Sequence, residues 1–113
     1  MSFQIISIKK ELRTCFTELL STNGEFIVLK STDPNPLVYH KKTNQISYIK
    51  SGSGFVTLGT QNLKICAGDL IIIPKNLRHS FTAKTSKMET LHIHWPTMYL
   101  DKDRYIEKER VVL

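Results

Sequence analysis

The sequence has little that would cross-link the chain or anchor it in a membrane. It contains only 2 cysteines in 113 residues, and Cys15 and Cys66 lie far apart, without the close Cys or His spacing of a zinc site. No apolar run approaches the ~20 residues that span a bilayer, and the first residues lack the features of a secretory signal. We therefore expect two free thiols, no membrane partner and a cytoplasmic location.

The sequence also lacks a concentrated charge of one sign. The formal net charge is +6, but the basic residues are scattered along the chain in short groups such as Lys9-Lys10 and Lys41-Lys42. Nucleic-acid binding normally needs a basic stripe or patch, so nucleic acid is not the expected partner. Solvated lysines at strand edges, which discourage edge-to-edge pairing, account for the charge without a partner.

Several common catalytic signatures are missing as well. There is no Gly-x-Ser-x-Gly elbow, no glycine-rich phosphate loop and no internal repeat. We also find no pair of carboxylates on a shared face. Any chemistry should therefore lie in an interior cavity.

What the sequence does have is a succession of short β-type runs rich in Ile, Val, Tyr and Phe. The runs are Glu25–Lys30, Pro36–His40, Gln45–Lys50, Gly54–Leu58, Leu63–Cys66, Leu70–Ile73, His79–Ala83 and Met88–Trp95. Turn-forming sequences such as Ser51-Gly52-Ser53-Gly54 separate them about every eight to twelve residues, which is typical of an antiparallel sandwich or barrel.

These runs predict one all-β domain with two flanking segments. Residues 25–96 form the barrel, and residues 1–24, which mix helix-compatible and β-branched stretches, are expected to pack on it. Residues 97–113 turn charged with helical spacing and are expected to form a short C-terminal helix or arm laid over the barrel.

The segment from Val38 to Gly52 resembles the first motif of the cupin superfamily. That motif has two histidines one residue apart, then a glutamate and a closing glycine. In this chain His40 takes the second histidine, Gln45 the glutamate and Gly52 the closing glycine. Val38 stands where the first histidine would be.

The second cupin motif is matched further along the chain. Gly68, Pro74 and His79 take its glycine, proline and histidine, whereas Asn76 and Ala83 depart from it. The departure at Asn76 is mild, since asparagine can adopt the left-handed conformation of the glycine it replaces. The resemblance implies a double-stranded β-helix, the jelly-roll barrel of cupins.

Cupins hold one divalent transition metal inside the barrel through imidazoles and a carboxylate. The resemblance therefore offers His40, Gln45 and His79 as metal ligands, with zinc, iron, nickel or manganese as the cofactor. The set is depleted, because Val38 replaces one imidazole and a carboxamide is a weaker ligand than a carboxylate. Each of the three is also open to a purely structural interpretation, as a hydrogen-bonded residue of the barrel interior.

Two further histidines, His92 and His94, alternate on the last predicted strand and so share one face. If that face points inward, all four histidines of the chain line one cavity, and His92 and His94 become candidate catalytic residues. The alternative is that Leu91, Ile93 and Trp95 form the buried face and leave both histidines in solvent. The sequence leaves both open.

Two functions from different classes follow. The first is a small metal-dependent cupin enzyme acting on a small polar metabolite, a sugar or carboxylic acid, by isomerase, lyase or dioxygenase chemistry. The alternative is a non-catalytic small-molecule-binding module resembling the sensing arm of sugar-responsive regulators. We also expect a homodimer, because alternation places Tyr39 and Tyr48 on the outside of the barrel.

Overall fold

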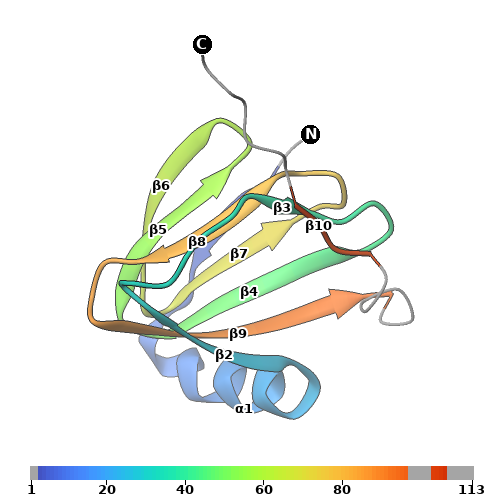
Figure 1. Cartoon of the computed structure of the whole chain (residues 1–113). Helices are drawn as coiled ribbons and strands as arrows, with labels where there is room; N and C mark the ends of the chain where they lie inside the picture. The colour runs from blue at the N-terminus through green and yellow to red at the C-terminus, as the bar shows by residue number, and fades with distance from the viewer. Residues whose placement is uncertain (1–2, 97–102, 107–113) are drawn as a thin grey trace.

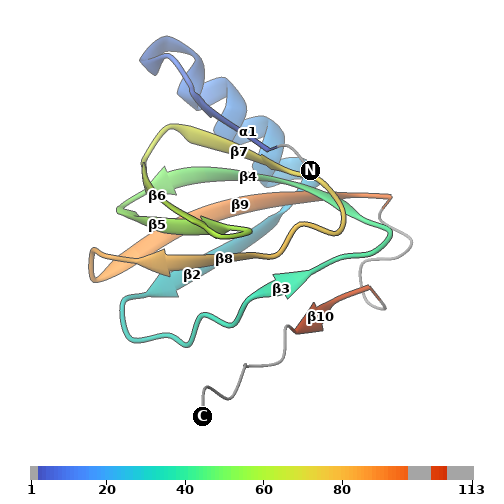
Figure 2. The same cartoon turned by 90° about the horizontal axis from the view of Figure 1, so that it is seen from above.

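Two antiparallel sheets face each other in the computed structural model of this chain, which describes residues 3–96 and 103–106 (Figures 1 and 2). The first sheet has the strand order β1-β7-β4-β9-β2 and the second β10-β3-β8-β5-β6. The strands are β1 (Gln4–Ser7), β2 (Glu25–Lys30), β3 (Val38–Tyr39), β4 (Asn44–Ser51), β5 (Ser53–Leu58), β6 (Gln61–Cys66), β7 (Asp69–Ile73), β8 (His79–Ala83), β9 (Lys87–Trp95) and β10 (Tyr105–Ile106). The all-β barrel predicted from the sequence is confirmed.

The eight strands from β2 to β9 lie on the eight runs that the sequence predicted, with bounds that shift by a few residues. The turns between them also behave as their residues indicate. Gly52 and Gly59 have φ of 84° and 63°, and Asn76 has φ of 71°. Asn76 therefore takes the left-handed conformation of the glycine that the second motif carries at its place.

A helix covers the outer face of the first sheet. A 3-10 turn, η1 (Lys10–Leu12), leads into α1 (Arg13–Asn23), which lies against β4 and β9 (Figure 1). Phe16 of α1 stacks on Tyr48 of β4 with ring centroids 6.5 Å apart, and Leu20 packs in the same cluster as Leu91. Both faces of the β4–β9 pair are consequently buried.

This helix corrects the expected exposure of Tyr48. The tyrosine does point out of the barrel, but α1 leaves it only 1% exposed. Tyr39 is half-buried and stacks on Tyr105 of β10 at 5.3 Å. The homodimer stays a prediction, and Tyr48 gives it no support.

The two flanking segments contribute strands of their own. β1 pairs with β7, so the segment 1–24 supplies a strand to the first sheet in addition to the helix packed on it. In the predicted C-terminal helix or arm, residues 103–104 have no regular secondary structure, and Tyr105–Ile106 form β10, which pairs with β3. The rest of 97–113 lies outside the described residues.

The space between the sheets is apolar at one end and polar at the other. Ile49 of β4 and Met88 of β9 are fully buried in a cluster with residues of β5, β6 and β7. Towards the other end of the same two strands, the inward positions are Gln45 and Ser47 on β4 and His92 on β9. The apolar cluster holds the sheets together, and the polar end forms the cavity described below.

The sequence also predicted free thiols and no membrane partner. Cys15 and Cys66 are free, as expected, and both are exposed. Within residues 3–96 and 103–106, no helix has the length and apolar character needed to cross a bilayer. The cytoplasmic location stays a prediction.

The close approach of β5 and β8 gives a test of this fold. A Cβ added at Gly54 would collide with the carbonyl oxygen of Thr82 on β8, whereas one at Gly59 would meet only the tip of Leu77, 3.6 Å away. We expect Gly54→Ala to lower the free energy of unfolding by roughly 3–5 kcal/mol. Gly59→Ala should cost about 1–2 kcal/mol, through its positive φ alone. Equal losses of unfolding free energy for the two variants, measured by urea denaturation, would contradict the close approach of β5 and β8.

Candidate functional site

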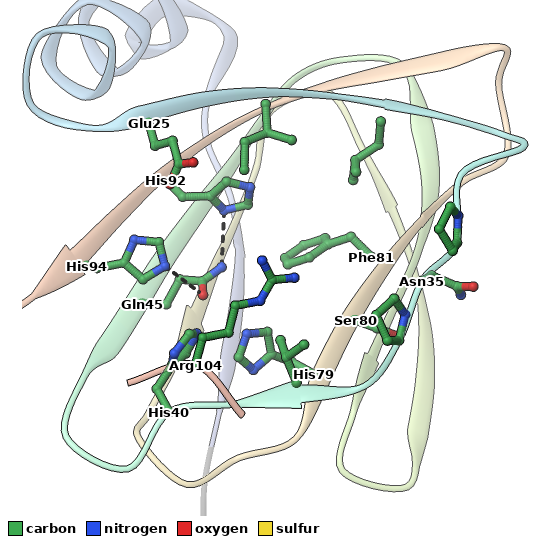
Figure 3. A pocket seen from close by; sticks show the side chains of 15 residues that line it. Glu25, Asn35, His40, Gln45, His79, Ser80, Phe81, His92, His94 and Arg104 are labelled. Carbon is green, nitrogen blue, oxygen red and sulfur yellow. Dashed lines mark hydrogen bonds between the residues drawn. The ribbon is translucent and has the colours of Figure 1, made fainter. Parts of the chain in front are cut away.

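A cavity of about 480 Å³ occupies the polar end of the barrel (Figure 3). All four histidines of the chain and Gln45 line it. Ile27, Leu29, Val38 and Phe81 form its apolar wall, and Glu25 and Arg104 are its formally charged members. The exposed residues Pro34, Asn35 and Pro36 also line it.

Strand register brings these polar groups together. β4 and β9 pair so that Gln45 lies opposite His94 and Ser47 opposite His92. His79 begins β8, where it pairs with Val38 of β3, and His40 follows β3 directly. The three residues predicted as metal ligands and the two predicted as catalytic residues therefore lie in one cavity.

The hydrogen bonds of His92 fix its tautomer. The Thr90 hydroxyl donates to the Ile27 carbonyl at 3.0 Å, so its oxygen can only accept from His92 Nε2, 2.8 Å away. His92 Nδ1 then carries the lone pair and accepts from Ser47 Oγ at 2.6 Å and from Gln45 Nε2 at 3.1 Å. His92 has both ring nitrogens occupied and is only 4% exposed, so it supports the cavity wall and offers no open nitrogen to a ligand.

The same network orients Gln45 and His94. Because the Gln45 amide nitrogen donates to Ser47 and His92, its Oε1 faces His94 and accepts from His94 Nε2 at 3.0 Å (Figure 3). His94 consequently keeps its lone pair on Nδ1. The network fixes the direction of the Gln45 amide, which the sequence could not.

His40 and His79 are held differently, by backbone carbonyls. His40 Nδ1 donates to the carbonyl of Asp103 at 2.7 Å, and His79 Nδ1 donates to the carbonyl of Leu77 at 2.9 Å. A neutral ring held in this way keeps its lone pair on Nε2. The two rings lie 5.3 Å apart, and no other described residue hydrogen-bonds either Nε2, so both nitrogens are available to a ligand.

Three of the cavity histidines, His79, His92 and His94, have a lowered pKa. Burial, with His40, His94 and Arg104 nearby, lowers the pKa of His79 to about 4 against the opposing hydrogen bond to Leu77. Burial lowers the pKa of His92 to about 3 and, together with His40, that of His94 to about 4. These three rings are therefore neutral at pH 7, and the cavity presents lone pairs and N–H groups in place of imidazolium charge.

The donor set falls short of a metal site. His40 and His79 have the tautomer that a metal ligand needs, with the other nitrogen fixed by a carbonyl. Gln45 Oε1 already accepts from His94, and Val38 supplies no ligand. In residues 3–96 and 103–106, no group of three or more His, Cys, Asp or Glu side chains is arranged to hold a metal ion. The metal assignment of His40, Gln45 and His79 stays a prediction.

Two charged lining residues were not predicted from the sequence. Glu25 begins β2, and Arg104 precedes β10 on the C-terminal arm. In Figure 3 the Arg104 side chain reaches into the cavity between the histidines and Phe81. No local pattern marks Arg104, because it enters the site through pairing of the arm with β3, more than sixty residues away in the chain.

Solved structures show the same barrel in other proteins. A cupin protein from Bacteroides fragilis is 27% identical, with 63% of this chain and 62% of that chain covered and a TM-score of 0.57. Salicylate 1,2-dioxygenase from Pseudoaminobacter salicylatoxidans, described with gentisate, is 16% identical over 76% of this chain and 24% of its own, with a TM-score of 0.64. Streptomyces PAC13, described with uridine, is 20% identical over 76% and 69%, with a TM-score of 0.61.

The chain spans less than two thirds of the Bacteroides cupin and about a quarter of the dioxygenase. No curated protein matches it significantly. The match to a family model is more direct. The cupin domain model covers residues 24–94, which include β2 to β8, most of β9 and every histidine of the cavity. With the barrel, the two motifs and this match in agreement, the chain belongs to the cupin family.

Proposed function

We propose that this cupin binds a small polar metabolite, of the sugar or carboxylic acid class, inside its barrel. The observation that carries the proposal is the convergence of four histidines on one open cavity, with His40 and His79 each presenting an unoccupied Nε2. A ligand hydroxyl group can donate to these nitrogens, while Phe81 and its apolar neighbours contact the carbon skeleton.

The proposed binding of the metabolite does not require a metal ion. Binding relies on the imidazole nitrogens of the cavity and on the His94–Gln45–His92 network, which is complete without an added ion. The descriptions of salicylate dioxygenase with gentisate and PAC13 with uridine name small polar molecules. At 16% and 20% identity they support the proposal through the shared barrel alone.

Proton transfer is a second candidate, favoured by the pairing of His40 with His79. An imidazole with a free Nε2 can take a proton from a bound C–H or O–H group and, as imidazolium, return it to a neighbouring atom of the same molecule, while the second ring, 5.3 Å away, accepts a hydrogen bond from that molecule. An isomerase or lyase needs this kind of step. Incorporation of solvent deuterium into a bound metabolite would distinguish turnover from binding.

Filling the cavity with a larger side chain tests the proposed binding. Ile27 faces the cavity, whereas its neighbour Val28 is 40% exposed on the outer face of β2. In saturation-transfer NMR with D-galactose, D-galacturonate, succinate and benzoate, we expect signals for the parent and for Val28→Trp. Ile27→Trp should lose them, because indole would fill the cavity. Equal signals from both variants would place the binding elsewhere.

A metal titration tests whether the cavity lacks a third strong protein ligand for a metal ion. We expect the untagged, dialysed parent to bind Zn²⁺ weakly by calorimetry. Val38→His, which places an imidazole opposite His79, should tighten binding by at least about 100-fold, as a third protein ligand completes the set. Stoichiometric tight metal in the parent would overturn the metal-free proposal.

The neutrality of the cavity predicts a dependence of stability on pH. The folded-state pKa of His92 is about 3, below its ordinary value of 6.5, so between these values the unfolded chain binds a proton that the folded chain does not. Stability should therefore be full above pH 6.5 and fall as the pH drops. His92→Asn should reduce the slope of unfolding free energy against pH between 6 and 4.5 by about 1.4 kcal/mol per pH unit. An unchanged slope would show that His92 is not held neutral.

A further inference from the structure

Arg104 differs from every other residue that lines the cavity. It is the lining side chain that stays positively charged at every physiological pH, whereas His79, His92 and His94 are neutral at pH 7. The residue is exposed, and its side chain extends into the cavity beside Phe81 (Figure 3). Glu25 lines the same cavity, yet no described carboxylate forms an ion pair with Arg104.

The position of Arg104 is set by the preceding residue. Asp103 is 2% exposed, and its Oδ2 accepts hydrogen bonds from the Lys42 backbone N–H and the Thr43 hydroxyl, both at 2.7 Å. Its Oδ1 accepts from the Lys41 N–H at 3.0 Å. These three bonds fasten the arm to the turn that follows His40.

The hydrogen bonds that attach the arm favour the ionised form of the Asp103 carboxylate. Burial alone would raise the pKa of Asp103, but the hydrogen bonds from Thr43, Lys42 and Lys41, with His40 nearby, hold it below its ordinary value. The backbone carbonyl of Asp103 also accepts a hydrogen bond from His40 Nδ1. One residue of the arm thus orients both Arg104 and the open nitrogen of His40.

The rest of the lining indicates what the guanidinium would recognise. Ile27, Leu29, Val38 and Phe81 offer an apolar surface, and the neutral imidazoles offer hydrogen bonds. A single planar guanidinium matches the two oxygens of one carboxylate. Phosphoryl groups usually engage a helix N-terminus or a glycine-rich loop, and the described cavity lining contains neither.

We propose that Arg104 determines specificity for a carboxylate joined to an apolar body, and that Asp103 is the positioning residue that holds Arg104 at the cavity. This rests on the proposed function, because it assigns the ligand class of the same cavity. The carboxylate accepts hydrogen bonds from the Arg104 guanidinium, and the apolar body lies against Phe81.

The test compares each acid with its shape-matched amide. Dissociation constants are measured by NMR titration for benzoate, phenylacetate and hexanoate and for the three corresponding amides, with phenyl phosphate as a second anion. We expect the parent to prefer acid over amide by about 10- to 100-fold, the range of a charge-assisted hydrogen-bonded pair. Arg104→Gln should abolish the preference while amide binding persists, and Arg104→Lys should restore part of it.

The positioning role of Asp103 has its own control on the same arm. Asp103→Ala and Thr43→Val should both lower the acid-to-amide ratio, because each weakens the attachment without removing the guanidinium. Ile106→Ala, at a residue 62% exposed on β10, should leave the ratio unchanged. An Asp103→Ala protein that fails to fold leaves Thr43→Val to decide.

The outcomes separate the two proposals. If the amides bind as well as the acids in the parent, or if Arg104→Gln keeps the preference, the role of Arg104 is wrong while the proposed binding function stands. Tighter binding of phenyl phosphate than of benzoate would also overturn the carboxylate assignment. If no acid, amide or sugar of the two experiments binds, or if Ile27→Trp binds them unchanged, the proposed function itself fails.

Discussion

The pairing of β4 with β9, covered on its outer face by α1, is the constraint on which the site depends. Side chains alternate along both strands, so one face must turn to the barrel interior and the other must be buried elsewhere. Phe16 and Leu20 of α1 bury the outer face by packing on Tyr48 and Leu91. The inner face is thereby free to carry Gln45, Ser47, His92 and His94, whose register makes them neighbours.

Burial then determines the chemistry of these neighbours. A buried imidazole is costly to charge, so His79, His92 and His94 stay neutral, and each buried ring N–H must find a defined acceptor. Thr90 and Gln45 serve His92 and His94, and main-chain carbonyls serve the other two rings. The consequence is a cavity of directed hydrogen-bonding groups whose fixed positive charge, Arg104, is brought in by a separate arm of the chain.

The barrel could be predicted from the sequence because turn residues and β-type runs are local features of the chain. Turn residues such as Gly52 and Asn76 impose backbone conformations that the chain adopts in the structure, and the β-type runs between them became strands β2 to β9. The motif positions also indicated that His40, Gln45 and His79 share the barrel interior, and all three line one cavity. The exposure assigned to Tyr48 was wrong, because alternation says nothing about a helix packed on the outer face.

The sequence by itself thus determined the fold class, the strands and the candidate histidines of the motifs. Only the tertiary structure decided that His92 and His94 point inward, because Leu91 and Ile93 could be buried as well once α1 covered them. It also decided the tautomers, which depend on partners from three strands, and the entry of Arg104, which depends on Asp103 meeting a turn sixty residues away. These features arise from contacts between distant segments, and a local pattern of residues carries no information about which distant segment will meet it.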